Sequence, residues 1–212
     1  KIDCYTVDSS YRPRVYNYIK RFLDAGRQGY IVCPLVEESE SGELKSAEEY
    51  YKDISENEFK DYSVGILHGK MSAKSKERQM RAFAAGETQL LICTTVIEVG
   101  IDVPNAAIMV IENAERFGLS QLHQLRGRIG RGKYQSSCVL ISDASAEQSR
   151  ERLAVLRDNS DGFRIADEDL RLRGPGDFLG SRQHGLPEFK IADLSSDMET
   201  MKNAGKAAKA LL

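Results

Sequence analysis

Gln89-Leu-Leu-Ile-Cys93 is a compact apolar run that leads directly into two threonines, Thr94 and Thr95. A short aliphatic run of this kind is typical of a strand buried on both faces of a parallel sheet. Other runs of similar character are also expected to be strands: Ile2–Val7, Gly29–Pro34, Tyr62–Leu67, Ala107–Ile111 and Ser137–Ile141.

Segments with helical periodicity separate these runs. Tyr11–Ala25 carries apolar residues at i, i+3, i+4, i+7 and i+8, and Gly26 is expected to end this helix. Ser72 is expected to cap a helix that runs to Ala85. Further helices are expected at Ala47–Phe59, Leu119–Leu125, Glu147–Arg157 and Asp161–Leu170. Strands that alternate with helices predict an α/β fold, with a parallel sheet covered by helices on both faces.

Composition narrows the class of protein. The chain has 212 residues, 41% of them hydrophobic, which is enough for a packed core, and its formal net charge is −2. Any nucleic-acid binding must therefore come from local basic patches. No apolar run approaches the roughly 20 residues of a membrane span, and there is no signal peptide. Four cysteines far apart in the sequence, three of them in apolar runs, indicate reduced thiols in a cytoplasmic protein.

The sequence suggests two parts, residues 1–143 and residues 144–212. The first holds the alternating strands and helices, and the second is expected to form two helices, a Gly- and Pro-rich loop from Arg171 to Phe189, and a terminal helix. Glu37–Lys45 is acidic and is expected to be a loop. Because the chain begins at Lys1 and not at Met, we expect it to be a piece of a longer protein.

Gln124-Leu-Arg-Gly-Arg-Ile-Gly-Arg-Gly132 concentrates three arginines among three glycines, and no acidic residue occurs between Arg116 and Asp143. A guanidinium holds phosphate oxygens with a planar fork of donors, and glycine lets the backbone approach a ligand closely. The segment suits a polyphosphate on which charge moves. Taken alone, it fits a basic surface turn equally well.

Thr94–Pro104 is the second polar segment that follows a strand. Threonine hydroxyls can hold a phosphate, and Asp102 can accept hydrogen bonds from a ribose. The alternative is a polar connection in which threonine caps a helix. Ligands of parallel sheets gather at the carboxyl ends of the strands, so Thr94–Asp102, Gln124–Gly132 and the step His68-Gly69 are expected to share that edge.

These segments resemble motifs of the superfamily 2 helicases. Thr94–Pro104 resembles motif V, and Gln124–Arg131 matches the Gln-x-x-Gly-Arg-x-Gly-Arg pattern of motif VI. Gly29–Pro34 resembles motif IV. Their order and separation resemble those of the second of the two RecA-like motor domains.

The second part resembles the translocation segment shared by the RecG family and the transcription-repair coupling factors, which is a helical hairpin followed by a loop. The resemblance rests on Asp161-Gly-Phe-x-Ile-Ala-x-x-Asp-Leu170, Arg171-Leu-Arg-Gly-Pro-Gly-Asp177 and Gly185-Leu-Pro-Glu-Phe189. The coupling factors typically have Ala where Pro175 stands, so the chain is more similar to RecG-like ATP-dependent DNA helicases. A coupling factor, or a nucleic-acid-binding module without motor activity, remains as an alternative.

The resemblance implies roles for individual residues. Arg128 and Arg131 would reach the γ-phosphate of ATP, and Gln124 would help to place the attacking water. Gly100 and Asp102 would contact the nucleotide, and Thr94 and Thr95 the nucleic-acid backbone. Arg126 could serve only to position the segment. Arg171, Arg173 and Gln183 would couple ATP-driven movement to travel along duplex DNA, although Arg173 could instead pair with Asp169, and Gln183 could be an ordinary loop residue.

The resemblance also implies what must lie elsewhere. No Gly-x-x-x-x-Gly-Lys-[Ser/Thr] occurs, and no Asp-Glu pair follows a strand. ATP and Mg²⁺ are therefore expected to be bound mainly by a first RecA-like domain, and branched DNA to be recognised by a wedge domain of the same chain. The implied protein moves on double-stranded DNA, regresses replication forks and migrates Holliday junctions in recombination and repair. It would be cytoplasmic and nucleoid-associated in a bacterial-type cell, and this part alone would be inactive.

Overall fold

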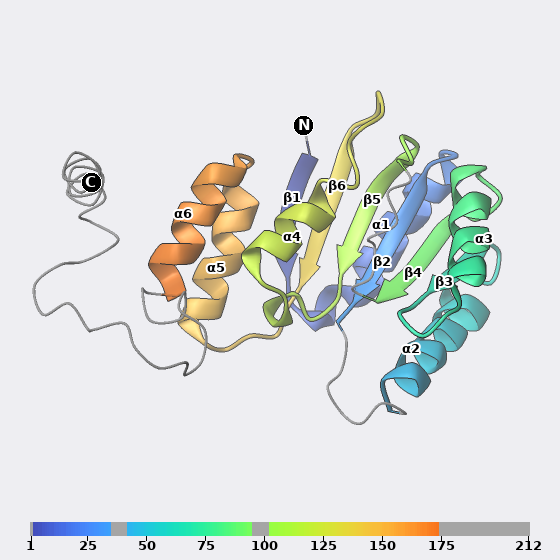
Figure 1. The fold of residues 1–212 in the computed structure, drawn as a ribbon, viewed down its shortest axis with the longest axis horizontal. Helices are drawn as coiled ribbons and strands as arrows, with labels where there is room; N and C mark the ends of the chain where they lie inside the picture. Colours follow the sequence, from blue (N-terminus) through green and yellow to red (C-terminus); the bar gives the residue numbers. More distant parts are fainter. Residues whose placement is uncertain (1, 35–41, 95–101, 174–212) are drawn as a thin grey trace, which may run out of the picture. The chain divides into compact units, whose positions relative to one another are not determined.

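A computed structural model describes residues 2–34, 42–94 and 102–173 of the chain, with the backbone alone for residues 42–47 and 173 (Figure 1). Within these ranges, six strands form one sheet. They are β1 (Ile2–Val7), β2 (Gln28–Cys33), β3 (Val64–Leu67), β4 (Leu90–Thr94), β5 (Ala106–Ile111) and β6 (Ser136–Ile141).

The strand order across the sheet is β1-β6-β5-β2-β4-β3, and every neighbouring pair is parallel. The predicted parallel α/β architecture is confirmed. Because all strands run the same way, their amino ends share one edge of the sheet, uppermost in Figure 1, and their carboxyl ends share the other.

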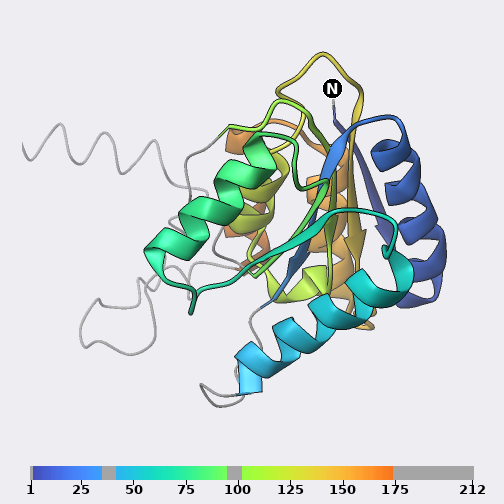
Figure 2. The ribbon, with the colours of Figure 1, turned by 90° about the vertical axis from the view of Figure 1, so that its right-hand side faces the viewer.

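Helices cover both faces of the sheet. Figure 2 shows α1 (Arg12–Asp24) on one side and α3 (Ala73–Ala84) with α4 (Leu119–Arg126) on the other. The remaining helical elements are α2 (Gly42–Asp53), a π-helical turn at Ile54–Glu58, 3-10 turns at Ser9–Tyr11 and Ala114–Arg116, α5 (Glu147–Asp158) and α6 (Gly162–Arg173). α5 packs against β1 and α4.

The core on the α1 face joins helix and sheet. Ile19 and Leu23 of α1 lie with Ile31, Val110 and Phe59 in one buried cluster. β4, β5 and β6 are buried along their whole length, as their apolar runs predict. Burying such side chains stabilises the fold by about 1.5–3 kcal/mol each.

The helix ends follow the predicted signals. The Ser72 hydroxyl accepts a hydrogen bond from the Ser75 backbone N–H at 3.2 Å, so Ser72 caps α3. Gly26 and Gly86 follow α1 and α3 with φ of +73° and +79°, a backbone conformation that favours glycine.

Two expectations about irregular segments were wrong in part. α2 begins at Gly42, inside the expected loop Glu37–Lys45, while residues 35–41 lie outside the described ranges. α6 continues to Arg173, although irregular structure was expected from Arg171. No proline precedes Pro175 in this stretch, so nothing in the backbone chemistry stops the helix earlier. The rest of the Gly- and Pro-rich loop lies outside the described ranges.

The chain separates into two compact units, residues 1–165 and residues 166–212. α5 therefore belongs to the first compact unit. The boundary near residue 143 concerns functional domains and stays a prediction. Within the described residues, no helix combines the length and apolar composition needed to cross a membrane. All four cysteines are free thiols, and Cys93 and Cys138 are buried.

Candidate functional site

The arginine segment lies at the amino edge of the sheet. It precedes β6, and a Cβ atom added at Gly130 would stand 2.7 Å from Ile2, at the start of β1. The expectation that it shares the carboxyl edge with Thr94 is therefore wrong. α4 carries the chain back across the sheet before the arginines are reached, so the loop that holds them is an amino-edge loop (Figure 1).

The ends of the two predicted motifs meet at this amino edge. Arg131 Nη1 lies 3.4 Å from Asp102 Oδ1, and both side chains are about half exposed. Arg131 Nε also donates to the Gly127 carbonyl at 3.0 Å. A Cβ atom on Gly132 would overlap the Pro104 carbonyl oxygen, so the two loops touch backbone to backbone. An exposed ion pair contributes little stability, and this leaves the Arg131 guanidinium free to change partner.

Arg128 and Gln124 lie on the same segment. Gln124 is exposed in α4, and Arg128 is half-buried just after the helix, where its backbone N–H donates to the Leu125 carbonyl at 2.9 Å. Tyr30 of β2 lies near Arg128 and Arg131 and was not among the predicted site residues. Burial raises the pKa of Tyr30, while the positive charges of Arg128 and Arg131 oppose this shift. Tyr30 gave no signal in the sequence because it stands inside a buried strand.

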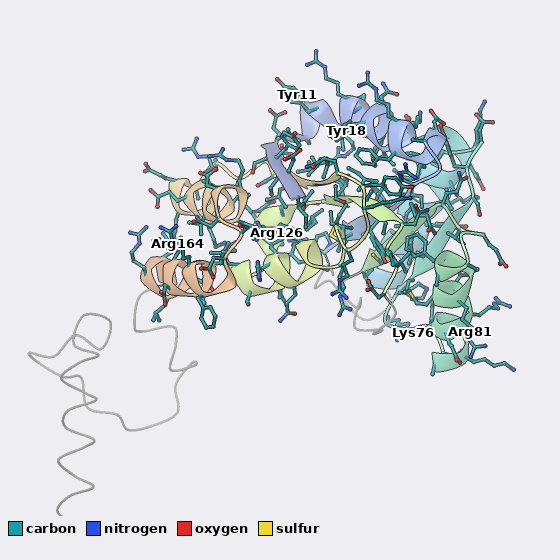
Figure 3. All side chains as sticks on the ribbon, turned by 90° about the horizontal axis from the view of Figure 1, so that it is seen from above. Tyr11, Tyr18, Lys76, Arg81, Arg126 and Arg164 are labelled. Carbon is teal, nitrogen blue, oxygen red and sulfur yellow. The ribbon has the colours of Figure 1, made fainter. Side chains whose placement is uncertain are left out.

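Arg126 turns away from this loop. Only 5% exposed, it donates from Nη1 to the carbonyl oxygens of Leu156 and Asn159, at 2.6 and 2.7 Å. Its Nη2 lies 3.0 Å from Nδ1 of His123, whose pKa is lowered by burial and then by Arg126. The cation thus satisfies carbonyls at the carboxyl end of α5. Arg126 therefore joins the end of α4 to α5, and its role in positioning the segment stays a prediction (Figure 3).

The carboxyl edge holds polar atoms without partners. Thr94, at the end of β4, is 6% exposed, and its hydroxyl has no hydrogen-bond partner among the described residues. His68 follows β3, and its buried Nδ1 atom also has no hydrogen-bond partner among the described residues. A buried polar group left unsatisfied costs about 1–3 kcal/mol, so such a group marks a place where a ligand could bind.

Glu112, at the end of β5, differs from Thr94 and His68 because its side chain has hydrogen-bond partners. Arg12 donates to its two carboxylate oxygens at 3.1 and 2.9 Å, and the Tyr50 hydroxyl donates to it at 3.0 Å. The hydrogen bond to Glu112 raises the pKa of Arg12. This part-buried pair, together with Tyr50, joins α1 and α2 to the sheet and occupies both carboxylate oxygens of Glu112.

The remaining candidates are placed only in part. Thr95, Gly100 and Gln183 lie outside the described residues, and Arg173 is described only as a backbone position in α6. The exposed Arg171 donates from Nε to Glu168 at 2.8 Å. Within the described ranges, no group of three His, Cys, Asp or Glu side chains could hold a metal ion.

Family models match both parts of the chain. Residues 14–133 match the helicase conserved C-terminal domain, and residues 159–212 match the C-terminal part of domain 3 of the ATP-dependent DNA helicase RecG. Curated relatives named ATP-dependent DNA helicase RecG include that of Synechocystis, 50% identical over 95% of this chain and 24% of its own length. That of Bacillus subtilis is 45% identical over the whole chain and 31% of its own length. The chain thus spans a quarter to a third of these relatives.

Solved structures agree with this. The structure of RecG bound to a three-way DNA junction is 44% identical, with a TM-score of 0.74, over 95% of this chain and 26% of that one. Domain 2 of the DEAD-box helicase Mss116p bound to an RNA duplex is 15% identical over 81% of this chain and 69% of that one. Its TM-score of 0.57 shows a shared fold. The chain belongs to the family of helicase conserved C-terminal domains and is of the RecG-like type among them.

Proposed function

We propose that this chain is the second RecA-like motor domain, with its translocation segment, of an ATP-dependent helicase that moves on double-stranded DNA. The observation that carries the proposal is the meeting of Arg131 and Asp102 at an open edge of the sheet. Both residues belong to segments that match helicase motifs, and both side chains are accessible. The names of the RecG relatives support the same activity.

ATP would bind at the amino edge. The described residues fit such a ligand, because two guanidinium groups and a carboxylate lie together there while the sequence holds no phosphate loop. A first RecA-like domain would bring the nucleotide with its Mg²⁺. Arg131 and Arg128 would then stabilise charge on the transferring phosphoryl group. Gln124 would orient the attacking water, and Asp102 with Gly100 would contact the nucleotide.

DNA would bind at the opposite, carboxyl edge. The unpartnered Thr94 hydroxyl, together with Thr95, would hold a backbone phosphate. The segment from Thr94 to Pro104 begins at this edge and ends beside the arginine segment at the other. It is therefore a covalent link through which nucleotide and DNA could influence each other.

Coupling to translocation would run through the second part of the chain. Arg126 ties α4 to the carboxyl end of α5, and a Cβ atom on Gly162 would stand 2.9 Å from His123 Nε2. The end of α4 thus contacts the turn that leads into α6. Arg171, Arg173 and Gln183 would transmit movement of this turn to the DNA. A wedge domain in the same chain would recognise forks and Holliday junctions, and the intact protein would regress forks and migrate branches on the bacterial nucleoid.

The test compares the 212-residue chain with the intact protein. The intact protein is expected to hydrolyse ATP in the presence of three-way junction DNA. It is also expected to convert the junction DNA to separated duplexes. This chain alone is expected to show neither activity, because it has no phosphate loop. A DNA-stimulated ATPase rate that persists in the purified chain and falls on Arg131→Ala would overturn the division of the site between two domains.

Arg173→Ala or Gln183→Ala in the intact protein should uncouple hydrolysis from movement. The active-site groups remain, so ATP should still be hydrolysed in the presence of DNA while fork processing is lost. ATPase and fork-regression assays on the same preparation would measure both. Normal fork processing in both variants would refute the coupling role.

A further inference from the structure

The outward face of α3 is strongly basic. Lys74, Arg78 and Arg81 follow one another at i, i+4 and i+7, all exposed, and Lys70 is exposed just before the helix. Met80 and Phe83 bury the opposite face. Figure 3 shows Arg81 projecting from α3 away from the sheet. A shallow groove of about 550 Å³ on α3 is lined by these three basic residues together with Ser72, Ser75 and two carboxylates, Glu77 and Glu87.

This concentration of charge contrasts with the whole chain. Residues 68–81 hold five basic side chains and one acidic side chain, a local net charge of +4 in a chain of net charge −2. Two of these basic side chains have partners within the protein. Glu77 pairs with Arg81 at 2.6 Å, and Lys76 Nζ donates to the Gly69 carbonyl at 2.7 Å. Lys70, Lys74 and Arg78 have no acidic partner within 4.0 Å among the described residues.

The basic face begins at the carboxyl edge of the sheet. β3 ends at Leu67, which pairs with Cys93, the residue before Thr94. Lys70 and Lys76 lie close enough to His68 to help burial lower its pKa, although Glu48 opposes the shift. The polar atoms of Thr94 and His68 that lack partners therefore lie at the end of the sheet where the basic face begins.

We infer that Lys70, Lys74 and Arg78 form a second contact with the DNA phosphate backbone, next to the contact at Thr94. The inference rests on the proposed function, since it extends the same DNA-binding edge. Lys74 and Arg78 are one turn apart, about 6 Å along the helix axis, a spacing that suits successive phosphates. Flexible cationic side chains on an exposed helix bind phosphate without reading bases. The contact is therefore independent of sequence, as movement along DNA requires.

The test is the salt dependence of duplex DNA binding by the intact protein without nucleotide. Each phosphate neutralised contributes about 0.9 to the slope of log K against log salt concentration. Lys74→Gln with Arg78→Gln should therefore lower the magnitude of the slope by about 1.8. The matched control is Arg14→Gln with Arg21→Gln, two exposed arginines of α1 on the other face of the sheet, which should leave the slope unchanged.

The outcomes separate this inference from the proposed function. A wild-type slope in the α3 double variant, with binding weakened by Thr94→Val, would overturn the α3 contact and leave the proposed function standing. An equal fall in slope in the α1 control would also overturn it, because net charge alone would explain the effect. If neither the α3 variant nor Thr94→Val weakens binding, DNA does not bind at this edge, and both proposals fall. Thermal melts of the α3 and α1 double variants should match the wild type, because the changed side chains are exposed.

Discussion

Replacing Arg131 with alanine in the intact protein is expected to abolish ATP turnover while duplex DNA binding is retained. An arginine that stabilises the charge of a transferring phosphoryl group contributes about 10³-fold or more to kcat. Arg131→Lys should not restore the rate, because an ammonium group cannot reproduce the planar fork of donors. Steady-state ATPase assays with saturating DNA, and DNA binding measured without nucleotide, check the two halves of the prediction.

The structure makes this result interpretable. Arg131 is half exposed, and its pair with the equally exposed Asp102 contributes at most about 1 kcal/mol to stability. Loss of turnover in Arg131→Ala would therefore not reflect unfolding, which a melting curve can confirm. Normal turnover combined with loss of DNA binding would refute the role in phosphoryl transfer and place Arg131 on the nucleic acid instead.

Much of the fold follows from local sequence. The apolar run at Gln89–Cys93 gave β4, and the Ser72 hydroxyl capped α3 as its position before a helical pattern indicates. These features depend on residues within one element, where side-chain chemistry and backbone preference agree. The parallel sheet then follows from the alternation of strands and helices.

The arrangement of the site was less accessible from sequence. The arginine segment was expected at the carboxyl edge, but α4 returns the chain to the amino edge first. Which edge a loop occupies depends on the direction of the elements before it, and not on the loop's own residues. The buried contacts of Arg126 with α5 are similarly non-local, since they join residues 30 and 33 positions apart.

The roles of the glycines in the arginine segment also depend on contacts that the local sequence does not reveal. Glycine within the arginine segment was expected to let the backbone approach a ligand. Two of these glycines instead serve the protein itself. Gly130 has a φ of +78°, in the left-handed region, and Gly132 packs against the backbone of Pro104. The contact between Gly132 and Pro104 sets the distance between the arginine segment and the segment that carries Asp102.

Gly132→Ala should therefore damage the nucleotide site without touching a charged group. The new Cβ atom would overlap the Pro104 carbonyl oxygen, which is backbone and cannot rotate away, so the two loops must separate. Displacing a catalytic group by about 1 Å can lower a rate about 100-fold, and we expect a fall of that order in kcat for ATP. Overpacking should also cost about 1–3 kcal/mol of stability, measured by denaturant unfolding.

Gly127→Ala provides the matched control for this prediction. Gly127 stands in the same segment with a right-handed helical backbone, and an added Cβ atom would come no closer than 3.3 Å to the Gln124 carbonyl oxygen. A slight shift accommodates that contact, so kcat should stay within a few-fold of the wild type. If Gly132→Ala turned over ATP as fast as this control, the close packing of the two loops would not determine where Arg131 lies. The arginine segment would then have to be positioned by α4 and Arg126 alone.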